Sequence, residues 1–465
     1  MRQGECGQVT VFLGLVLISF WMVCSICIEG IYVRMKSAEI IEQQMASAEY
    51  AQANFHKELW EQFHLFGIDG RYASKMDASL KKNWKDNMGT EVDLMTTDHI
   101  DLTQAEGKIL RHQIREYMKY AESTKLLDQL KQLLKGVEDD AQTESMKGQV
   151  DKITQAEEGE TEAEEDVEAK AEDPRKALKK LLSGDILSLV LPAGKTPSEK
   201  EVEIQYGKKG SRKENKPDFF KKESVSDLLD QEDKGSISNQ IASEGLTAAY
   251  AADVFRTAVD PESKKGLCYE MEYLIAGKEE ERDNLKSVVN RLLAVRFALN
   301  YAYLLSSSDK QAQAYALAAA ITSVASAIPA VVEGVKMLLL AAWAYGEAVI
   351  DVRSLLKGNK IPLKKDSATW QLQLENLSSL TAGEKTQSNG ISYKGYLQLL
   401  LLAAVDKDNT YKRMMDVIQQ RIRETQSDFS LQECIFSFQM NVSATIRSIF
   451  YPKDYEVENH RVFVY

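Results

Sequence analysis

The sequence contains little of what most catalytic or metal sites require. Only five of its 465 residues are cysteine and five are histidine, and they are too scattered for a disulfide scaffold or a zinc site. It has no glycine-rich nucleotide-binding loop, no HExxH motif and no GxSxG nucleophile elbow. The obvious enzyme classes are therefore missing, and we predict a protein without catalytic, cofactor-binding or metal-ligating residues.

Two pairs of these scattered residues could still act together. Cys268 and Cys434 are the only cysteines beyond the N-terminal region, and their separation leaves open whether they form a disulfide. His56 and His64 are eight positions apart, about two helical turns, so they could share a face. Surface polar side chains explain the two histidines better than a metal site, which needs closer ligands or contributions from elsewhere.

The chain also lacks a basic surface. Residues 138–173 hold 15 acidic and 3 basic residues, which accounts for the whole net charge of −12 and leaves the rest of the chain neutral. This acidic stretch has almost no large apolar residue, and we expect it to be a disordered linker. An acidic segment repels nucleic acid, and no basic face with interleaved aromatic residues stands out elsewhere. We therefore exclude nucleic-acid binding.

One long apolar run dominates the N-terminus. Residues 9–28 carry no charge, and a helix of that length spans the roughly 30 Å hydrocarbon core of a bilayer. A cleaved signal peptide has a shorter apolar region and a small-residue cleavage site, which is missing here. We expect a single transmembrane helix that remains as an anchor. Charge hardly decides its orientation, since Arg2 on one side is balanced by Arg34 and Lys36 on the other.

Glu29 directly follows this apolar run. A carboxylate at the edge of a transmembrane helix is costly unless it is neutral, interfacial or paired. Two interpretations stay open: simple interfacial placement, or an intramembrane assembly contact with the amino terminus or a basic group of a neighbouring subunit. Glu29 is the one residue that we single out as a candidate site.

Apolar residues continue beyond the membrane at helical spacing. They recur mostly every three or four positions, at Ile31, Met35, Ala38, Ile41, Met45, Ala48, Phe55, Leu59 and Phe63. We expect one helix to leave the bilayer, continue through these residues and end at the glycines of residues 67–70. It is either a membrane-proximal core helix or a pilin-like spine, half in the membrane and half supporting a soluble domain.

Most of the remaining chain also shows helical spacing of apolar residues. The predicted helical regions are residues 109–134, 236–352, 393–405 and 414–422. Within them, residues 315–332 are nearly long enough to cross a bilayer. Their alanine and serine content, Pro329 and the charges that follow favour a buried helix pair over a second membrane span.

Strand patterns are short and lie mainly at the C-terminus. Residues 429–446 alternate apolar and polar side chains, residues 462–465 are strand-like, and residues 92–96 alternate briefly. The sequence therefore predicts a mainly α protein with a small C-terminal β-sheet, an α+β class, in which one transmembrane helix continues into a long amphipathic helix.

These patterns divide the chain into seven segments. They are a cytoplasmic tail (1–8), the transmembrane helix (9–28), a long helix with a membrane-proximal domain (29–137), the acidic linker (138–173), a short helix with a basic and polar linker (174–235), a helical core domain (236–428) and C-terminal strands (429–465).

Several short segments together resemble a known group of proteins. They are residues 7–13 (GQVTVFL), 28–30, 48–50, 63–69, 113–120 (QIREYMKY), 270–278 (EMEYLIAGK), 290–293 and 341–345. As a set they resemble an uncharacterised family of Firmicutes membrane proteins related to the TadE/TadG-like pseudopilins of tight-adherence (Tad, or Flp) pilus systems. The likeness covers most of the chain outside the two linkers.

The resemblance implies a cytoplasmic N-terminus, an extracytoplasmic bulk and an association with pilus or secretion machinery, and it implies no catalytic residue. One departure concerns processing. Ordinary type IV prepilins carry glutamate five positions after the cleavage glycine, whereas Phe12 lies there if Gly7 is that glycine. This departure argues against cleavage by a prepilin peptidase.

We therefore expect a single-pass cell-membrane protein that acts by contacts, as a structural or assembly component of a Tad-like pilus or related apparatus. Its expected partners are the membrane and other subunits of that apparatus, and self-association stays open. The rival hypothesis is an envelope sensor or enzyme with a site between the helical core and the C-terminal sheet. A multi-span transporter subunit is disfavoured by the single convincing span and the negative mean hydropathy.

Overall fold

The computed structural model describes residues 5–73, 75–88, 93–120, 184–207, 237–261, 263, 265–322, 329–377, 379–380, 390–403 and 407–465. They fall into two compact units. Unit 1 holds the described residues up to Gln113 and from Gln426 onward, and unit 2 holds those from Ile114 to Thr425. The predicted acidic linker (138–173), the end of the first predicted helical region (121–134) and most of the basic linker lie outside the described residues.

Unit 1 combines a long N-terminal helix with an antiparallel sheet. Its elements are α1 (Glu5–Gln52), α2 (Lys57–Phe63), α3 (Gly70–Ala73), α4 (Met76–Met88), β1 (Asp93–Asp101), the 3-10 turns η1 (Ala105–Gly107) and η4 (Leu431–Glu433), β2 (Ile435–Ile446) and β3 (Tyr455–Val464). Helix α5 (Lys108–Tyr120) begins in unit 1 and continues into unit 2. In the sheet, β2 lies between β1 and β3.

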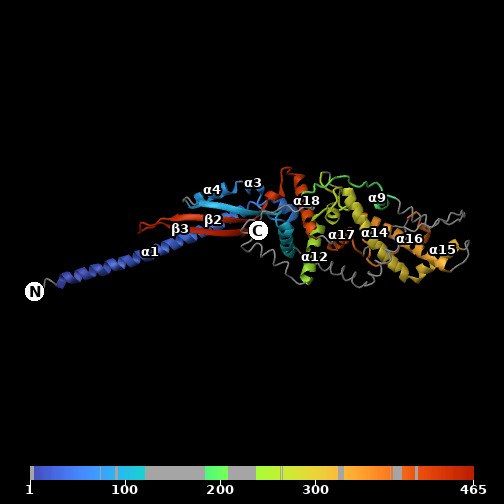
Figure 1. Ribbon diagram of the computed structural model, residues 1–465, viewed down its shortest axis with the longest axis horizontal. Coiled ribbons are helices and arrows are strands. Elements are labelled where there is room, and N and C mark those ends of the chain that lie inside the picture. The colour runs from blue at the N-terminus through green and yellow to red at the C-terminus, as the bar shows by residue number, and fades with distance from the viewer. Residues whose placement is uncertain are drawn as a thin grey trace. The chain divides into compact units, whose positions relative to one another are not determined.

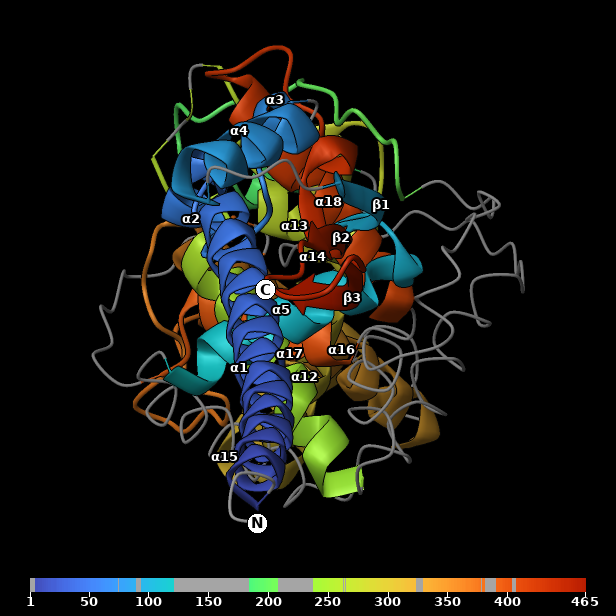
Figure 2. The ribbon, with the colours of Figure 1, turned by 90° about the vertical axis from the view of Figure 1, so that its left-hand side faces the viewer.

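From Phe438 to Ile446, β2 alternates buried apolar and more exposed polar residues, which gives the sheet one apolar face. Its apolar face packs against α1 and α4, and the strands run beside the second half of α1 (Figures 1 and 2). This core contains Ile40, Ala48 and Ala51 of α1, Met76, Leu80 and Trp84 of α4, and Phe438, Met440, Val442, Ala444 and Ile446 of β2. The C-terminal strands thus fold onto the N-terminal helix.

The long helix ends earlier than its apolar stripe predicts. We expected it to continue through Phe63 to the glycines at residues 67–70, but α1 ends at Gln52 and α2 is a separate short helix. In the segment between them, His56 N–H donates to the carbonyl of Gly67 (2.9 Å), and Asp69 N–H donates to the carbonyl of Asn54 (3.0 Å). These backbone groups therefore bond to a neighbouring segment instead of continuing the helix.

Unit 2 is helical. Its elements are α9 (Ile186–Val190), α12 (Ile237–Val254), α13 (Glu270–Ala276), α14 (Glu281–Ser306), α15 (Ser308–Thr322), α16 (Pro329–Leu356), the 3-10 turn η3 (Leu374–Asn376), α17 (Tyr393–Leu402) and α18 (Lys407–Arg423). Helices α14, α15 and α16 pack together (Figure 1). One face of α14 and most of α16 supply the buried residues of this bundle.

The predicted fold class is confirmed: the protein is mainly helical with a small antiparallel sheet and one long apolar N-terminal helix. One further detail differs. The brief alternation predicts a strand at residues 92–96, whereas β1 runs from Asp93 to Asp101 and pairs with β2, so a strand from the first half of the chain joins the C-terminal sheet. Residues 315–322 end α15 and residues 329–332 begin α16, so the described part of this range forms two helices as predicted. Ala318 and Val332 are buried, but Tyr315 and Val331 are 49% and 45% exposed, so only one face of the pair is buried.

Candidate functional site

The first part of α1 is an apolar surface. Phe12, Leu13 and Trp21 are 68%, 63% and 65% exposed. Among the residues that the structure describes, α1 is the only helix long and apolar enough to cross a membrane, and none of its apolar window is buried within the protein. An exposed apolar surface of this kind contacts lipid or a partner protein. This half of α1 is therefore the principal candidate site.

Beyond residue 28, α1 has two different faces. One face is buried against the sheet by Ile40, Gln44 and Ala48. Gln44 donates to the carbonyl of Met440 (2.9 Å), which ties the helix to β2. On the other face Ile31 is 59% and Met35 67% exposed, and residues four positions apart share a face of a helix. Even in the part of α1 that packs on the sheet, the opposite face of the helix therefore exposes apolar side chains.

Glu29, the residue predicted as an assembly contact, lies at the junction of the two halves and is only 3% exposed. The backbone N–H of Ile449 donates to its two carboxylate oxygens (3.3 and 3.1 Å), and that of Phe450 donates to one of them (3.3 Å). Both donors lie in the loop between β2 and β3. The carboxylate is therefore hydrogen-bonded within its own chain, and its role in assembly stays a prediction.

Unit 2 contains a buried charge network that sequence analysis missed. Arg296 of α14 pairs with Asp351 of α16 at 2.9 Å, and both are fully buried. Lys365 pairs with the same Asp351 (2.6 Å) and with Glu347, which also lies on α16. Two cations and two carboxylates thus neutralise one another in the helical core, as burial of charge requires.

The pKa values of this network follow from burial and pairing. Burial opposes ionisation of Asp351, but Arg296 and Lys365 outweigh it and lower the pKa of Asp351. Burial likewise opposes the charge of Arg296, and Asp351 and Tyr396 outweigh it and raise the pKa of Arg296. Arg296 also donates to the carbonyls of Pro362 and Leu363, at 3.0 Å each. The network therefore holds a loop against two helices, which is a structural role.

A third buried carboxylate, Glu272, lacks such a counter-charge. Glu272 of α13 accepts hydrogen bonds at Oε1 from Tyr393 Oη (2.8 Å) and from the backbone N–H of Ala258 (2.9 Å). Among the described residues no hydrogen-bond partner reaches its Oε2 atom. Burial raises the pKa of Glu272 to about 7, and the two hydrogen bonds offset this only in part. Glu272 is thus a buried carboxyl group of unit 2 whose pKa lies near neutral pH.

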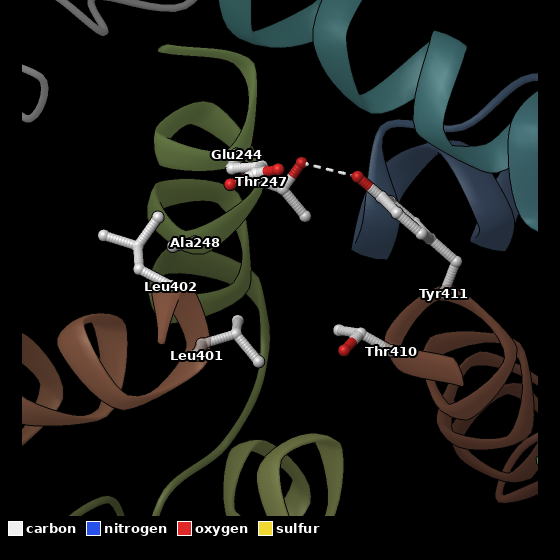
Figure 3. A pocket seen from close by; sticks show the side chains of 7 residues that line it. All are labelled: Glu244, Thr247, Ala248, Leu401, Leu402, Thr410 and Tyr411. Atoms are coloured by element: carbon white, nitrogen blue, oxygen red, sulfur yellow. Dashed lines mark hydrogen bonds between the residues drawn. The ribbon is translucent and has the colours of Figure 1, made fainter. Parts of the chain in front are cut away.

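Two small cavities lie among the described residues, one in each unit. One cavity of about 30 Å³ lies between α12, α17 and α18, where Thr247 and Tyr411 share a hydrogen bond (2.9 Å) across its rim (Figure 3). Another cavity of about 30 Å³ lies in unit 1 beside His56, Asp69 and Cys434. Such volumes hold a water molecule, whereas ligand sites typically need roughly 300–1,000 Å³. The alternative of a sensor or enzyme site between the helical core and the sheet stays a prediction.

The two histidines considered as a metal pair mark the ends of α2. His56 Nδ1 accepts a hydrogen bond from the backbone N–H of Leu59 (3.2 Å) and caps the helix start. His64 ends the helix in the left-handed conformation, with φ of 55°. No cluster of three metal-binding side chains occurs in the described part of the chain. Cys268 and Cys434 are free thiols in different units.

Two sequence signals could have located features that we missed. Glu347 and Asp351 are carboxylates four positions apart in an otherwise apolar helix, which indicates a buried charge site. Ile449, Phe450 and Tyr451 are consecutive apolar or aromatic residues in a turn between strands, where polar residues are usual.

Comparison with known proteins gives one family. Neither the curated proteins nor the solved structures contain a significant match. Residues 164–446 match a family of unknown function, DUF5702, and the match includes α9, the helices from α12 to α18, and β2. Because the match covers more than half of the sequence, the chain belongs to the DUF5702 family.

Proposed function

We propose that this protein is a membrane-anchored structural component of a Tad-like pilus or related secretion apparatus and acts by protein–protein contacts. The observation that carries the proposal is α1, one continuous helix of 48 residues. Its first half is apolar and exposed, and its second half packs on an antiparallel sheet. A helix divided in this way suits a subunit that is held in the membrane by one half and supports a folded domain with the other.

Assembly contacts are proposed for the outer face of α1 just beyond the membrane. Ile31 and Met35 are large, apolar and mostly exposed there. Apolar side chains on a helix face are a common means of packing against another helix. The link to Tad systems is supported by the resemblance of the N-terminal and core segments to that group. The proposed topology has a cytoplasmic N-terminus and an extracytoplasmic bulk, and the proposed role requires no catalysis.

Co-purification after gentle detergent extraction of native membranes tests the proposal. Tagged wild-type protein is expected to recover pilins or a secretion ATPase platform, and an Ile31→Ser, Met35→Ser double variant is expected to lose them. Ala46→Ser is the matched control, because Ala46 is also exposed on α1 but small. A clean monomer, or equal recovery with all three chains, would contradict the assembly role.

A second experiment tests the topology separately. Alkaline phosphatase fused after Tyr465 folds only outside the cytoplasm, whereas green fluorescent protein at the same position fluoresces only inside. We expect active phosphatase and no fluorescence. The reverse pattern would place the bulk of the protein in the cytoplasm.

A further inference from the structure

The loop between β2 and β3, residues 447–454, has an apolar tip. Ile449 is 52%, Phe450 50% and Tyr451 38% exposed. Turns between strands are usually built from glycine, asparagine, aspartate or serine, because these residues suit turn geometry and water. Three successive large side chains at a turn therefore indicate that the tip meets something other than water.

The tip lies beside the end of the apolar part of α1. The N–H groups of Ile449 and Phe450 donate to the Glu29 carboxylate, and the hydroxyl of Tyr451 lies 3.3 Å from Oγ of Ser25. Figure 1 shows the hairpin of β2 and β3 running along α1 toward its N-terminal half. Ser25 precedes Glu29 by one helical turn, about 6 Å along the axis. The tip therefore reaches a level inside the uncharged segment of residues 9–28.

We propose that this loop is a second membrane anchor, in which Ile449, Phe450 and Tyr451 enter the boundary between lipid headgroups and acyl chains. The inference rests on the proposed insertion of α1, because that insertion puts Ser25 and Glu29 at the bilayer surface. Aromatic residues concentrate at this depth, where the ring is apolar and a hydroxyl can remain near water. Exposed Arg447 and Lys453 flank the tip, against one acid, Asp454, and suit the lipid phosphates.

The loop also accounts for Glu29. An ionised carboxylate at the membrane edge is costly when it is unpaired. Here the backbone N–H groups of the inserted loop supply hydrogen bonds to it. Glu29 thus fixes the depth of the loop relative to the helix, and the β-sheet is held against the bilayer at two points rather than one.

Spin labelling of the full chain in lipid nanodiscs tests the proposal. Single labels are placed through Phe450→Cys, Ile28→Cys and Glu458→Cys in a chain whose five native cysteines are replaced by serine or alanine. At Phe450→Cys we expect loss of accessibility to a water-soluble nickel complex and access to oxygen, as at Ile28→Cys. Glu458→Cys, exposed on β3, is the aqueous control.

The reference label separates the two proposals. If the Ile28→Cys label is itself open to nickel, the insertion of α1 fails, and the loop anchor fails with it. If Ile28→Cys is shielded while Phe450→Cys is open to nickel, only the loop anchor is overturned. If the Phe450→Cys label is shielded from both nickel and oxygen and shows dipolar coupling to another label, the tip contacts a second copy of the chain. That result would also overturn the loop anchor.

A photo-crosslinking amino acid in place of Phe450 gives an independent measurement with all native cysteines kept. Crosslinks to lipid are expected. Crosslinks only to protein, or none in a chain that is correctly inserted, would contradict the membrane contact.

Discussion

The two units differ in where they place charged side chains and apolar surface: one buries ion pairs, and the other exposes an apolar helix. Unit 2 completely buries the ion pairs Arg296–Asp351 and Lys365–Glu347, whose opposite charges neutralise one another inside the fold. Unit 1 has an apolar core between helix and sheet but leaves the apolar half of α1 exposed. Buried charges need partners inside the fold, whereas exposed apolar surface needs a partner outside it. Unit 2 therefore depends on its own ion pairs, and unit 1 depends on its surroundings.

The largest expected effect comes from breaking the ion pairs of unit 2. Arg296→Met removes one of two cations and leaves Glu347 and Asp351 against Lys365 alone. Loss of one partner of a buried pair costs about 3–5 kcal/mol of unfolding free energy. Thermal or urea unfolding of the detergent-solubilised chain, followed by tryptophan fluorescence, measures the loss.

An exposed ion pair in the same unit provides the control. Arg282 pairs with Asp185 at 2.8 Å, with side chains 46% and 38% exposed. Arg282→Met is expected to cost about 1 kcal/mol or less, because water screens exposed pairs. Equal losses from the two arginine variants would show that burial does not set the strength of these interactions.

The second-largest expected effect is a change of stability with pH. The folded pKa of Glu272, about 7, lies above its ordinary value, so the folded state binds more protons than the unfolded state between those two values. The stabilisation from neutral Glu272 is therefore complete at low pH and is lost as the pH rises toward 7. Glu272→Gln stays neutral, and its stability relative to wild type should improve by up to about 3 kcal/mol between pH 4 and pH 8.

Unfolding midpoints at several pH values test this shift. Glu279→Gln, which replaces an exposed carboxylate close by in the sequence, serves as the control and should not reproduce the pH dependence. A difference between Glu272→Gln and wild type that is the same at pH 4 and pH 8 would mean that Glu272 does not titrate near neutral pH in the folded protein.

The sequence predicts the local features of both units better than their pairings. Alternation at residues 429–446 and the apolar run at 9–28 are local patterns, and they predict β2 and the exposed half of α1. That β1 pairs with β2, with Asp93 opposite Ser443, depends on register between distant segments. No local pattern sets that register, because it follows from the turn geometry and the faces that are buried.

The candidate site shows the same limit. Glu29 could be singled out because a carboxylate beside an apolar run is unusual. Its partners are backbone N–H groups of Ile449 and Phe450, which every residue except proline possesses and which leave no signature in the sequence. Asp351 could have been noticed inside an apolar helix, but its partner Lys365 lies in a loop that helical periodicity does not cover.

A smaller effect is expected in unit 1 at Glu29. Glu29→Ala should leave expression intact, cost about 1 kcal/mol through lost hydrogen bonds and impair recovery of partner subunits. Glu29→Gln keeps an acceptor oxygen for the N–H groups of Ile449 and Phe450 and should retain recovery. Co-purification and unfolding of both variants separate the roles. If both variants recover fewer partner subunits, assembly requires the negative charge of Glu29. If neither variant does, Glu29 has no role in assembly.

The smallest effect concerns a neutral hydrogen bond in unit 2. Ser392 caps α17, and its Oγ accepts from the backbone N–H of Gly395 at 3.3 Å. Ser392→Ala should cost about 0.5–1 kcal/mol, and Ser392→Asp should restore most of it, because aspartate is also a good helix cap. Both are measured by the same unfolding experiment as Arg296→Met. If Ser392→Ala were as damaging as Arg296→Met, unit 2 would be sensitive to the loss of any hydrogen bond, and its buried charges would lose their special importance for stability.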